Sequence, residues 1–139
     1  MLIRVGLSVK SRNMQTHLEK ALSYSDVRVE SFGHLRSAWL KVVRSGCDVI
    51  VISEALIPRP TENGIAILND LPENPTTVII HESDSAEEHA HLAAAGADVA
   101  GSPFRLPGQK IQDLLHILRH RSREFKCFTR NGMLQHKSA

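Results

Sequence analysis

A short, nearly continuous apolar run in the middle of the chain constrains the fold more than any other feature. The run Val49–Ile52 is preceded by Gly46 and followed by Ser53, Glu54 and Pro58. Aliphatic residues bounded by turn signals in this way are typical of a strand buried on both faces, as in the middle of a parallel sheet. The working groups of such sheets lie just beyond the carboxyl ends of the strands. The two polar residues after the run are therefore the first candidates for a functional site.

Length and composition describe one globular domain of ordinary size. The chain has 139 residues, of which 42% are apolar and 23% charged, and its net charge is +2. Such a chain can bury a full core, and its small net charge favours no nucleic-acid surface. No apolar run reaches the length of a membrane span, and the two cysteines have no metal-binding spacing. We therefore expect a cytoplasmic protein that contacts no membrane and holds no metal or cofactor.

Strand and helix signals alternate along the chain. Strands are expected near residues 2–9, 26–32, 49–52, 76–80 and 99–101. Helices are expected over residues 11–23, 34–45, 64–71 and 85–96, and from 107 to about 123. Ser85 and Glu88 are expected to form a capping box at the start of the fourth of these. Residues 59–63 are expected to form a loop, because Pro58 precedes them, Pro60 lies among them and they lead into an Asn-Gly step. This order predicts an α/β fold with a parallel sheet and helices on both faces.

One sequence pattern occurs twice. Residues Ser45–Val49 match Ala95–Val99, and each segment contains a glycine, then one residue, then an aspartate and a valine. Gly46 is predicted to end its helix in the left-handed conformation. We interpret the repeat as a recurrent connection from a helix into a strand, since two copies of so short a pattern do not establish a duplicated domain.

Three segments together resemble the receiver domain of bacterial response regulators, the CheY-like family. Asp48–Pro58 looks like the third strand and following loop of the family, and Ala95–Asp98 like its Gly-Ala-Asp/Asn step. Ser102–Phe104 stands where the family has Lys-Pro-Phe. The resemblance implies a flavodoxin-like (βα)5 three-layer sandwich with a five-stranded parallel sheet in the order 2-1-3-4-5. It also implies a receiver-like domain over residues 1–123, with residues 124–139 as a C-terminal tail or the start of a linker.

The residues that hold Mg²⁺ in that family are replaced here. Receiver domains carry paired acidic residues after the first strand, where this chain has Ser8, Val9 and Lys10. The first acidic residue of the whole sequence is Glu19. Since a hard cation needs oxygen ligands, the resemblance implies that this position has lost its main ones.

The positions that take and read the phosphoryl group are also changed. Counting back four residues from Pro58 places Glu54 at the phosphoacceptor position, whereas counting from Asp48 places Ser53 there. The family has Ser or Thr after the fourth strand, where this chain has His81 and Glu82, and Lys after the fifth, where it has Ser102. Neither candidate acceptor is an aspartate, and neither reading group is present.

Glu54 allows two interpretations. A glutamate at the acceptor position can imitate a phosphorylated aspartate and fix an active state, but that imitation needs the lysine and hydroxyl that read the charge. Alternatively, its carboxylate is simply solvated or capped at the mouth of a loop.

These replacements predict a degenerate receiver, or pseudo-receiver, that is not an enzyme and signals through phosphorylation-independent protein contacts. Its expected partners are other signalling proteins or further domains of a longer regulator, and the domain itself is not expected to bind nucleic acid. By resemblance, a partner or homodimer would use the face formed by the fourth helix, fifth strand and fifth helix. Candidate residues there are Phe104, Arg105 and Arg119.

A second hypothesis keeps the scaffold but changes the function. A small enzyme or ligand-binding domain with a flavodoxin-like fold would use polar residues at the strand ends. The residues available for this are Ser53, Glu54, His81 and Ser102.

Overall fold

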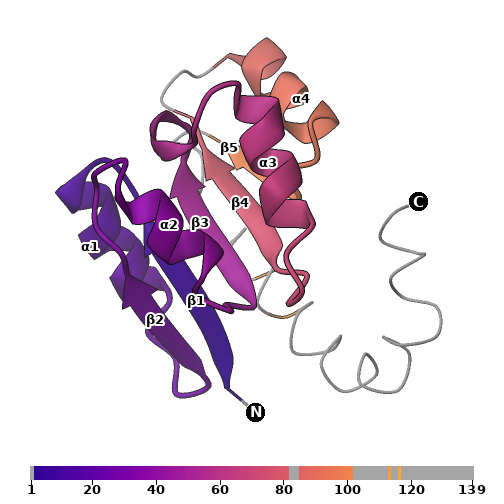
Figure 1. The fold of residues 1–139 in the computed structure, drawn as a ribbon. Coiled ribbons are helices and arrows are strands. Elements are labelled where there is room, and N and C mark those ends of the chain that lie inside the picture. Colours follow the sequence, from indigo (N-terminus) through magenta and orange to yellow (C-terminus); the bar gives the residue numbers. More distant parts are fainter. Residues whose placement is uncertain (1, 82–84, 102–112, 114–115, 117–139) are drawn as a thin grey trace.

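The computed structural model describes residues 2–81, 85–101, 113 and 116, and these residues form one five-stranded parallel sheet (Figure 1). The strand order is β2-β1-β3-β4-β5, which confirms the predicted order and the flavodoxin-like fold. The strands are β1 (Ile3–Ser8), β2 (Val27–Ser31), β3 (Val49–Ser53), β4 (Thr76–Ile80) and β5 (Val99–Gly101). The central strand β3 is therefore the apolar run from which the fold was inferred.

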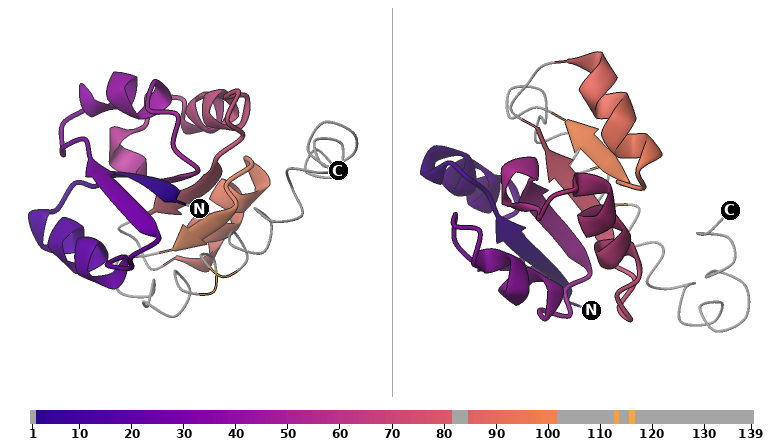
Figure 2. Two further views of the ribbon diagram at one scale, coloured as in Figure 1. Left: turned by 90° about the horizontal axis from the view of Figure 1, so that it is seen from below. Right: turned by 45° about the horizontal axis from the view of Figure 1, so that its top comes forward.

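Helices cover both faces of the sheet. They are α1 (Arg12–Ala21), α2 (Ala38–Val43), α3 (Thr61–Asn69) and α4 (Ala86–Ala94), with a single 3₁₀ turn, η1 (Glu54–Leu56), directly after β3. Figure 2 shows α1 on one face, and α2 and α3 on the other. The helix expected from residue 107 lies largely outside the described residues. Among the described helices, none is long and apolar enough to cross a membrane.

Strand β3 divides its side chains between two apolar cores, as alternation along a strand requires. Val49 and Val51 join the core beneath α1, with Leu18 of that helix. Ile50 and Ile52 join the opposite core, which includes buried residues of α2, α3 and α4. All five residues of β3 are buried, which confirms the prediction of a strand covered on both faces.

The repeated Gly-x-Asp-Val pattern has a shared structural role. Gly46 and Gly96 both have positive φ, at 65° and 114°, a conformation that favours glycine. Gly96 directly follows the C-cap of α4, whereas Gly46 lies two residues beyond Arg44, the C-cap of α2. The carboxylate of Asp48 then accepts a hydrogen bond from the backbone N–H of Arg4 at 2.8 Å. That of Asp98 accepts one from the backbone N–H of Thr77, also at 2.8 Å. Each aspartate thus joins the start of its own strand to the neighbouring strand.

The prediction for residues 59–63 was wrong at its C-terminal end, because α3 begins at Thr61. Gly64, predicted as the first residue of this helix, is instead the fourth residue of α3. A Cβ on Gly64 would lie 2.2 Å from Cγ2 of Ile57 and 3.3 Å from the carbonyl oxygen of Pro58. The glycine is therefore needed for close packing between the helix and the preceding loop.

Helix α2 is shorter than expected. It begins at Ala38, four residues after the predicted start at His34. The backbone N–H of Ala38 donates to the carbonyl of Leu35, and that of Trp39 to the carbonyl of Arg36. These three-residue spacings are those of a turn, so the segment before α2 is wound too tightly for an α-helix.

Cys47 lies between α2 and β3. Its side chain is buried in the core that contains Ile50 and Ile52. Burial raises the pKa of its thiol, with a smaller opposing effect from a hydrogen bond to Ser45. The residue is therefore a small apolar residue of this core.

Candidate functional site

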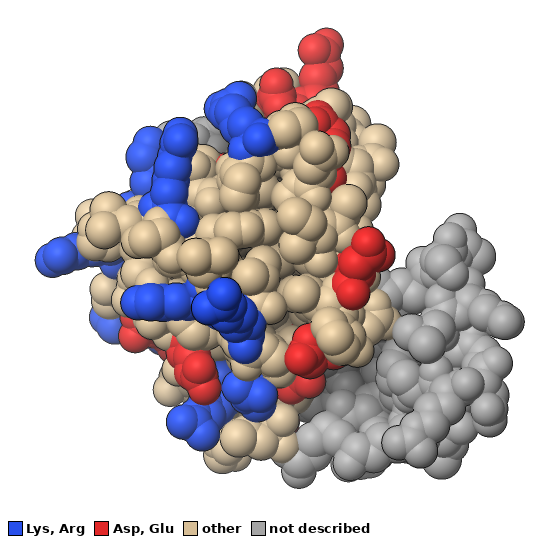
Figure 3. Space-filling model, in the orientation of Figure 1, with Lys and Arg blue, Asp and Glu red and all other residues tan. Residues whose placement is uncertain are grey.

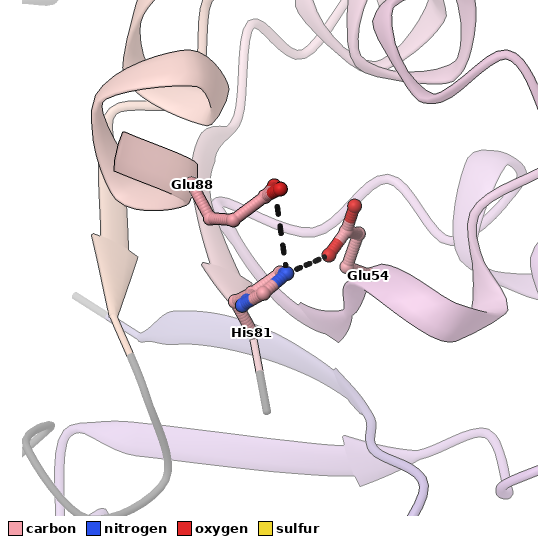
Figure 4. A group of neighbouring side chains, drawn as sticks. All are labelled: Glu54, His81 and Glu88. Atoms are coloured by element: carbon pink, nitrogen blue, oxygen red, sulfur yellow. Dashed lines mark ion pairs between the residues drawn. The ribbon is translucent and has the colours of Figure 1, made fainter. Parts of the chain in front are cut away.

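Three side chains converge where β3 and β4 end. Nε2 of His81 lies 2.7 Å from a carboxylate oxygen of Glu54 and 3.7 Å from one of Glu88. Figure 4 shows the two carboxylates approaching the same imidazole nitrogen. The Glu54 and His81 side chains are mostly buried, with 21% and 14% of their surface exposed, whereas Glu88 is 48% exposed. This group, called here the Glu-His-Glu cluster, lies at the edge of the sheet where function was expected.

Each member of the cluster is held by a different element. Glu54 is the first residue of η1, so its position follows directly from the end of β3. The backbone N–H of His81 donates to the carbonyl of Gly101 at 2.9 Å, which extends the β4–β5 pairing by one residue. Edge-on packing of the His89 ring, with centroids 6.1 Å apart, further restricts the His81 ring.

Glu88 reaches the cluster through the cap of α4. The hydroxyl of Ser85 accepts a hydrogen bond from the backbone N–H of Glu88 at 3.3 Å, as the sequence pattern Ser-x-x-Glu predicts. In a complete capping box the glutamate would bond back to the serine N–H, but here its carboxylate is directed at His81 (Figure 4). The predicted capping box is therefore only half formed, and the carboxylate contributes to the site instead.

The residues at the end of β1 offer no carboxylate to this edge. Ser8 is fully buried and its hydroxyl donates to the carbonyl of Gly33 at 3.0 Å. Val9 is fully buried in the core beneath α1. The backbone N–H of Lys10 donates to the hydroxyl of Ser53 at 2.9 Å. Ser8 and Ser53 thus hold the backbone together, and of the two candidate acceptors only Glu54 has its side chain beside His81.

The cluster opens into a cleft of about 890 Å³ between η1, α3 and α4. A second histidine–glutamate pair lines it, with Nε2 of His91 2.6 Å from an oxygen of Glu62. The pKa of Glu62 is lowered, first by a hydrogen bond from its own backbone N–H and then by the bond to His91. The cleft wall thus carries two imidazoles, each against a carboxylate.

Charge is distributed unevenly over the molecule. In Figure 3, most Lys and Arg side chains lie over the half formed by β2, α1 and α2, with some acidic side chains among them, whereas the α3 and α4 side and its top edge carry mainly Asp and Glu side chains. The cleft wall includes four carboxylates and one guanidinium. These residues are Glu54, Glu62, Glu87, Glu88 and Arg59. The cleft is therefore suited to a cationic ligand.

The structure brings together some of the residues singled out from the sequence. Glu54 and His81 are in direct contact, whereas Ser8, Val9, Lys10 and Ser53 have the structural roles described above. The sequence identified Glu88 only as a cap and did not identify the Glu62–His91 pair. Several further candidates lie outside the described residues, namely Glu82, Ser102, Phe104, Arg105 and Arg119.

Comparison with solved structures shows the fold of response-regulator receiver domains. The chain is similar to a CheY-like receiver domain protein from Methanospirillum hungatei, with a TM-score of 0.69, 14% identity and coverage of 89% of this chain and 99% of that one. It is also similar to the response regulator domain of Thermotoga maritima CheB (TM-score 0.61, 18% identity, 86% and 96% covered). The chain is likewise similar to an orphan response regulator of H. pylori, with a TM-score of 0.62, 17% identity and coverage of 86% of this chain and 95% of that one.

No family model and no curated protein matches the sequence. At identities this low, the structural likeness establishes the receiver fold, and a shared fold does not by itself imply a shared function.

The Glu54–His81 contact is expected to stabilise the fold measurably. In a double-mutant cycle with Glu54→Gln and His81→Ala, we expect a coupling energy of about 1 kcal/mol, because both side chains are largely removed from water. Urea unfolding of the four proteins near neutral pH measures it. A coupling energy indistinguishable from zero would mean that the two groups do not interact in solution. Glu30→Gln, at the more exposed and longer ion pairs with Arg28 and Arg4, is the matched control and should change stability by less than about 0.5 kcal/mol.

Proposed function

We propose that the chain is a pseudo-receiver, a signalling module that acts through protein contacts and takes no phosphoryl group. The observation that carries the proposal is the contact between Glu54 and His81 at 2.7 Å. By resemblance to receiver domains, these residues stand at the phosphoacceptor position and at the position of the phosphate-reading hydroxyl. Here the first position has a glutamate in place of the aspartate, and its carboxylate is held by the imidazole at the second position, where the hydroxyl that reads a phosphate is missing.

The end of β1 supports the same proposal. Phosphoryl transfer in this fold depends on a divalent cation that neutralises the developing charge. The positions where receivers hold that cation are Ser8, which donates to a backbone carbonyl, and Val9, which is buried in a core. Neither can supply an anionic oxygen.

The surroundings of Glu54 also indicate that its side chain has a fixed position. The carboxylate is neither fully solvated nor bonded to backbone amides, since its contact is with an imidazole. A fixed negative group beside a fixed partner gives the site a single permanent arrangement, where a working receiver would alternate between two. We propose that partner recognition is therefore constitutive, on the face that includes α4 and β5.

Catalysis is not part of the proposal. An enzyme on this scaffold would need a nucleophile beside a base, and Ser53 is the candidate nucleophile in the described part of the site. Ser53 is buried, with 5% of its surface exposed, and its hydroxyl accepts a hydrogen bond from the backbone N–H of Lys10. This arrangement supports a binding function over an acyl- or phosphoryl-transfer one.

Treatment with a small phosphodonor tests the proposal directly. The full chain is incubated with acetyl phosphate and Mg²⁺, and intact-mass spectrometry measures any phosphoryl adduct. We expect none, while a receiver domain that carries the acidic pair and the aspartate is labelled in the same mixture. A phosphoryl adduct that is lost in Glu54→Gln would overturn the proposal.

A further inference from the structure

We propose that the Glu-His-Glu cluster is a binding site for a divalent transition-metal ion such as Zn²⁺, held by Glu54, His81 and Glu88. One ligand atom from each residue lies within 4.8 Å of the other two. The sequence predicts no metal site, because no two of these residues have a metal-ligand spacing. They come from three different elements, and the fold alone brings them together.

The hydrogen-bond chemistry of His81 supports a metal ion. Two carboxylates face the same nitrogen, at 2.7 and 3.7 Å. An imidazole nitrogen carries at most one hydrogen, so it can donate to only one of them. Glu88 is too distant for a hydrogen bond and has no other side-chain partner among the described residues. A cation in place of that hydrogen can bind all three atoms at once.

The two distances from His81 Nε2 to the carboxylate oxygens are close to those of a tetrahedral site, and the two oxygens lie within 4.8 Å of each other. Ligand atoms bound to Zn²⁺ at about 2.0–2.1 Å are about 3.3 Å apart along the edge of the tetrahedron. The Glu88 oxygen already lies 3.7 Å from the nitrogen, and the Glu54 oxygen would have to move away from it by a fraction of an ångström. The half-exposed side chain of Glu88 can move closer to the nitrogen in turn, since it is held only at its backbone.

The donor set also selects the class of metal. One imidazole with carboxylates suits zinc and its transition-metal neighbours, whereas Mg²⁺ prefers oxygen ligands in an octahedron. Three protein ligands leave a position open toward the cleft, where water or a carboxylate of a partner could bind. The four carboxylates of the cleft wall would attract the ion, against the single guanidinium of Arg59.

A bound ion would have a structural consequence. Glu54 is fixed to the end of β3 and His81 to the end of β4, whereas Glu88 belongs to α4. The metal would therefore join α4 to the sheet, on the side where receiver-like domains place a partner face. Because the ion would bind the folded state alone, it would raise the melting temperature as its concentration rises.

Titration of the full 139-residue chain with Zn²⁺ by isothermal calorimetry tests the site, and visible absorption of the Co²⁺ form reports its geometry. We expect one equivalent to bind, a rise of several degrees in Tm, and the intense Co²⁺ bands of four-coordinate geometry. His81→Ala and Glu88→Gln should each weaken binding by roughly tenfold to a hundredfold or more. Mg²⁺ at millimolar concentration should not compete.

The matched controls are on α1, where His17 and Glu19 are exposed and far from the cleft. His17→Ala and Glu19→Gln should bind Zn²⁺ as the parent chain does. If His81→Ala does not fold, Glu88→Gln still tests the site, because its side chain is half exposed. Unchanged affinity in Glu88→Gln and His81→Ala, or equal losses in the α1 controls, would overturn the proposal.

The zinc site and the pseudo-receiver function can fail separately. A phosphoryl adduct at Glu54 would contradict the function but would leave the zinc titration as it is. Absence of zinc binding would contradict the metal site but would leave the expected result of the phosphodonor experiment unchanged.

Discussion

Ile52→Ala is expected to destabilise the protein by about 2–5 kcal/mol, the usual cost of emptying a well-packed core position. Ile52 is fully buried on the central strand and packs in the core that includes Leu68 and Leu92. The loss has two parts. The free energy gained by burying the removed methyl and methylene groups is lost, and the surrounding side chains only partly refill the cavity. Urea unfolding followed by circular dichroism measures the change in the free energy of unfolding.

Ile67→Ala is the matched control for that experiment. Ile67 is an isoleucine of α3 with 48% of its surface exposed, so the same atoms are removed where little packing is lost. We expect a change within about 0.5 kcal/mol. Similar losses at the two positions would mean that Ile52 does not occupy a core strand, and the sheet order would then be in doubt.

Gly64→Ala is expected to destabilise the protein by about 1–3 kcal/mol, although alanine is the better helix former. The added Cβ would lie 2.2 Å from Cγ2 of Ile57, and that methyl is attached to a stiff β-branched side chain. The carbonyl of Pro58 at 3.3 Å limits movement of the helix in another direction. The gain in helix propensity, about 1 kcal/mol, is smaller than the cost of this overlap.

A second substitution identifies the overlap as the cause. Ile57→Ala removes the methyl that the new Cβ would meet, so Gly64→Ala should cost much less in that background than in the parent chain. The double-mutant cycle should therefore show favourable coupling of about 1 kcal/mol or more. If Gly64→Ala stabilises the parent chain, α3 does not pack on the loop as described.

Much of the fold could be predicted because its signals are local. The buried run of β3, the serine that caps α4 and the positive φ of Gly46 are each encoded within a few residues, and the structure confirms them. The start of α3 was predicted three residues too late, because Asn63-Gly64 looks like a turn when only the local sequence is considered. The reason for that glycine is a contact with Ile57, which only the folded structure brings against the helix.

The site could be predicted only in part, for a related reason. Glu54 and His81 were found because both follow buried strands, and parallel strands end at the same edge. Glu88 was interpreted as a cap, since nothing in the spacing of α4 indicates that its carboxylate turns toward His81. Convergence of a helix residue on a sheet edge depends on how the helix packs, which no pattern within the helix records.

A two-dimensional amide NMR titration of the full chain with Mg²⁺, and then with Mg²⁺ and beryllofluoride, tests the central claim most directly. Beryllofluoride imitates a phosphoryl group on an acceptor aspartate and needs the metal to bind. If the chain is a pseudo-receiver, the amides of Ser8, Glu54 and His81 keep their positions throughout. Saturable shifts of those amides at low millimolar Mg²⁺ would contradict the account and would show a working phosphoreceiver.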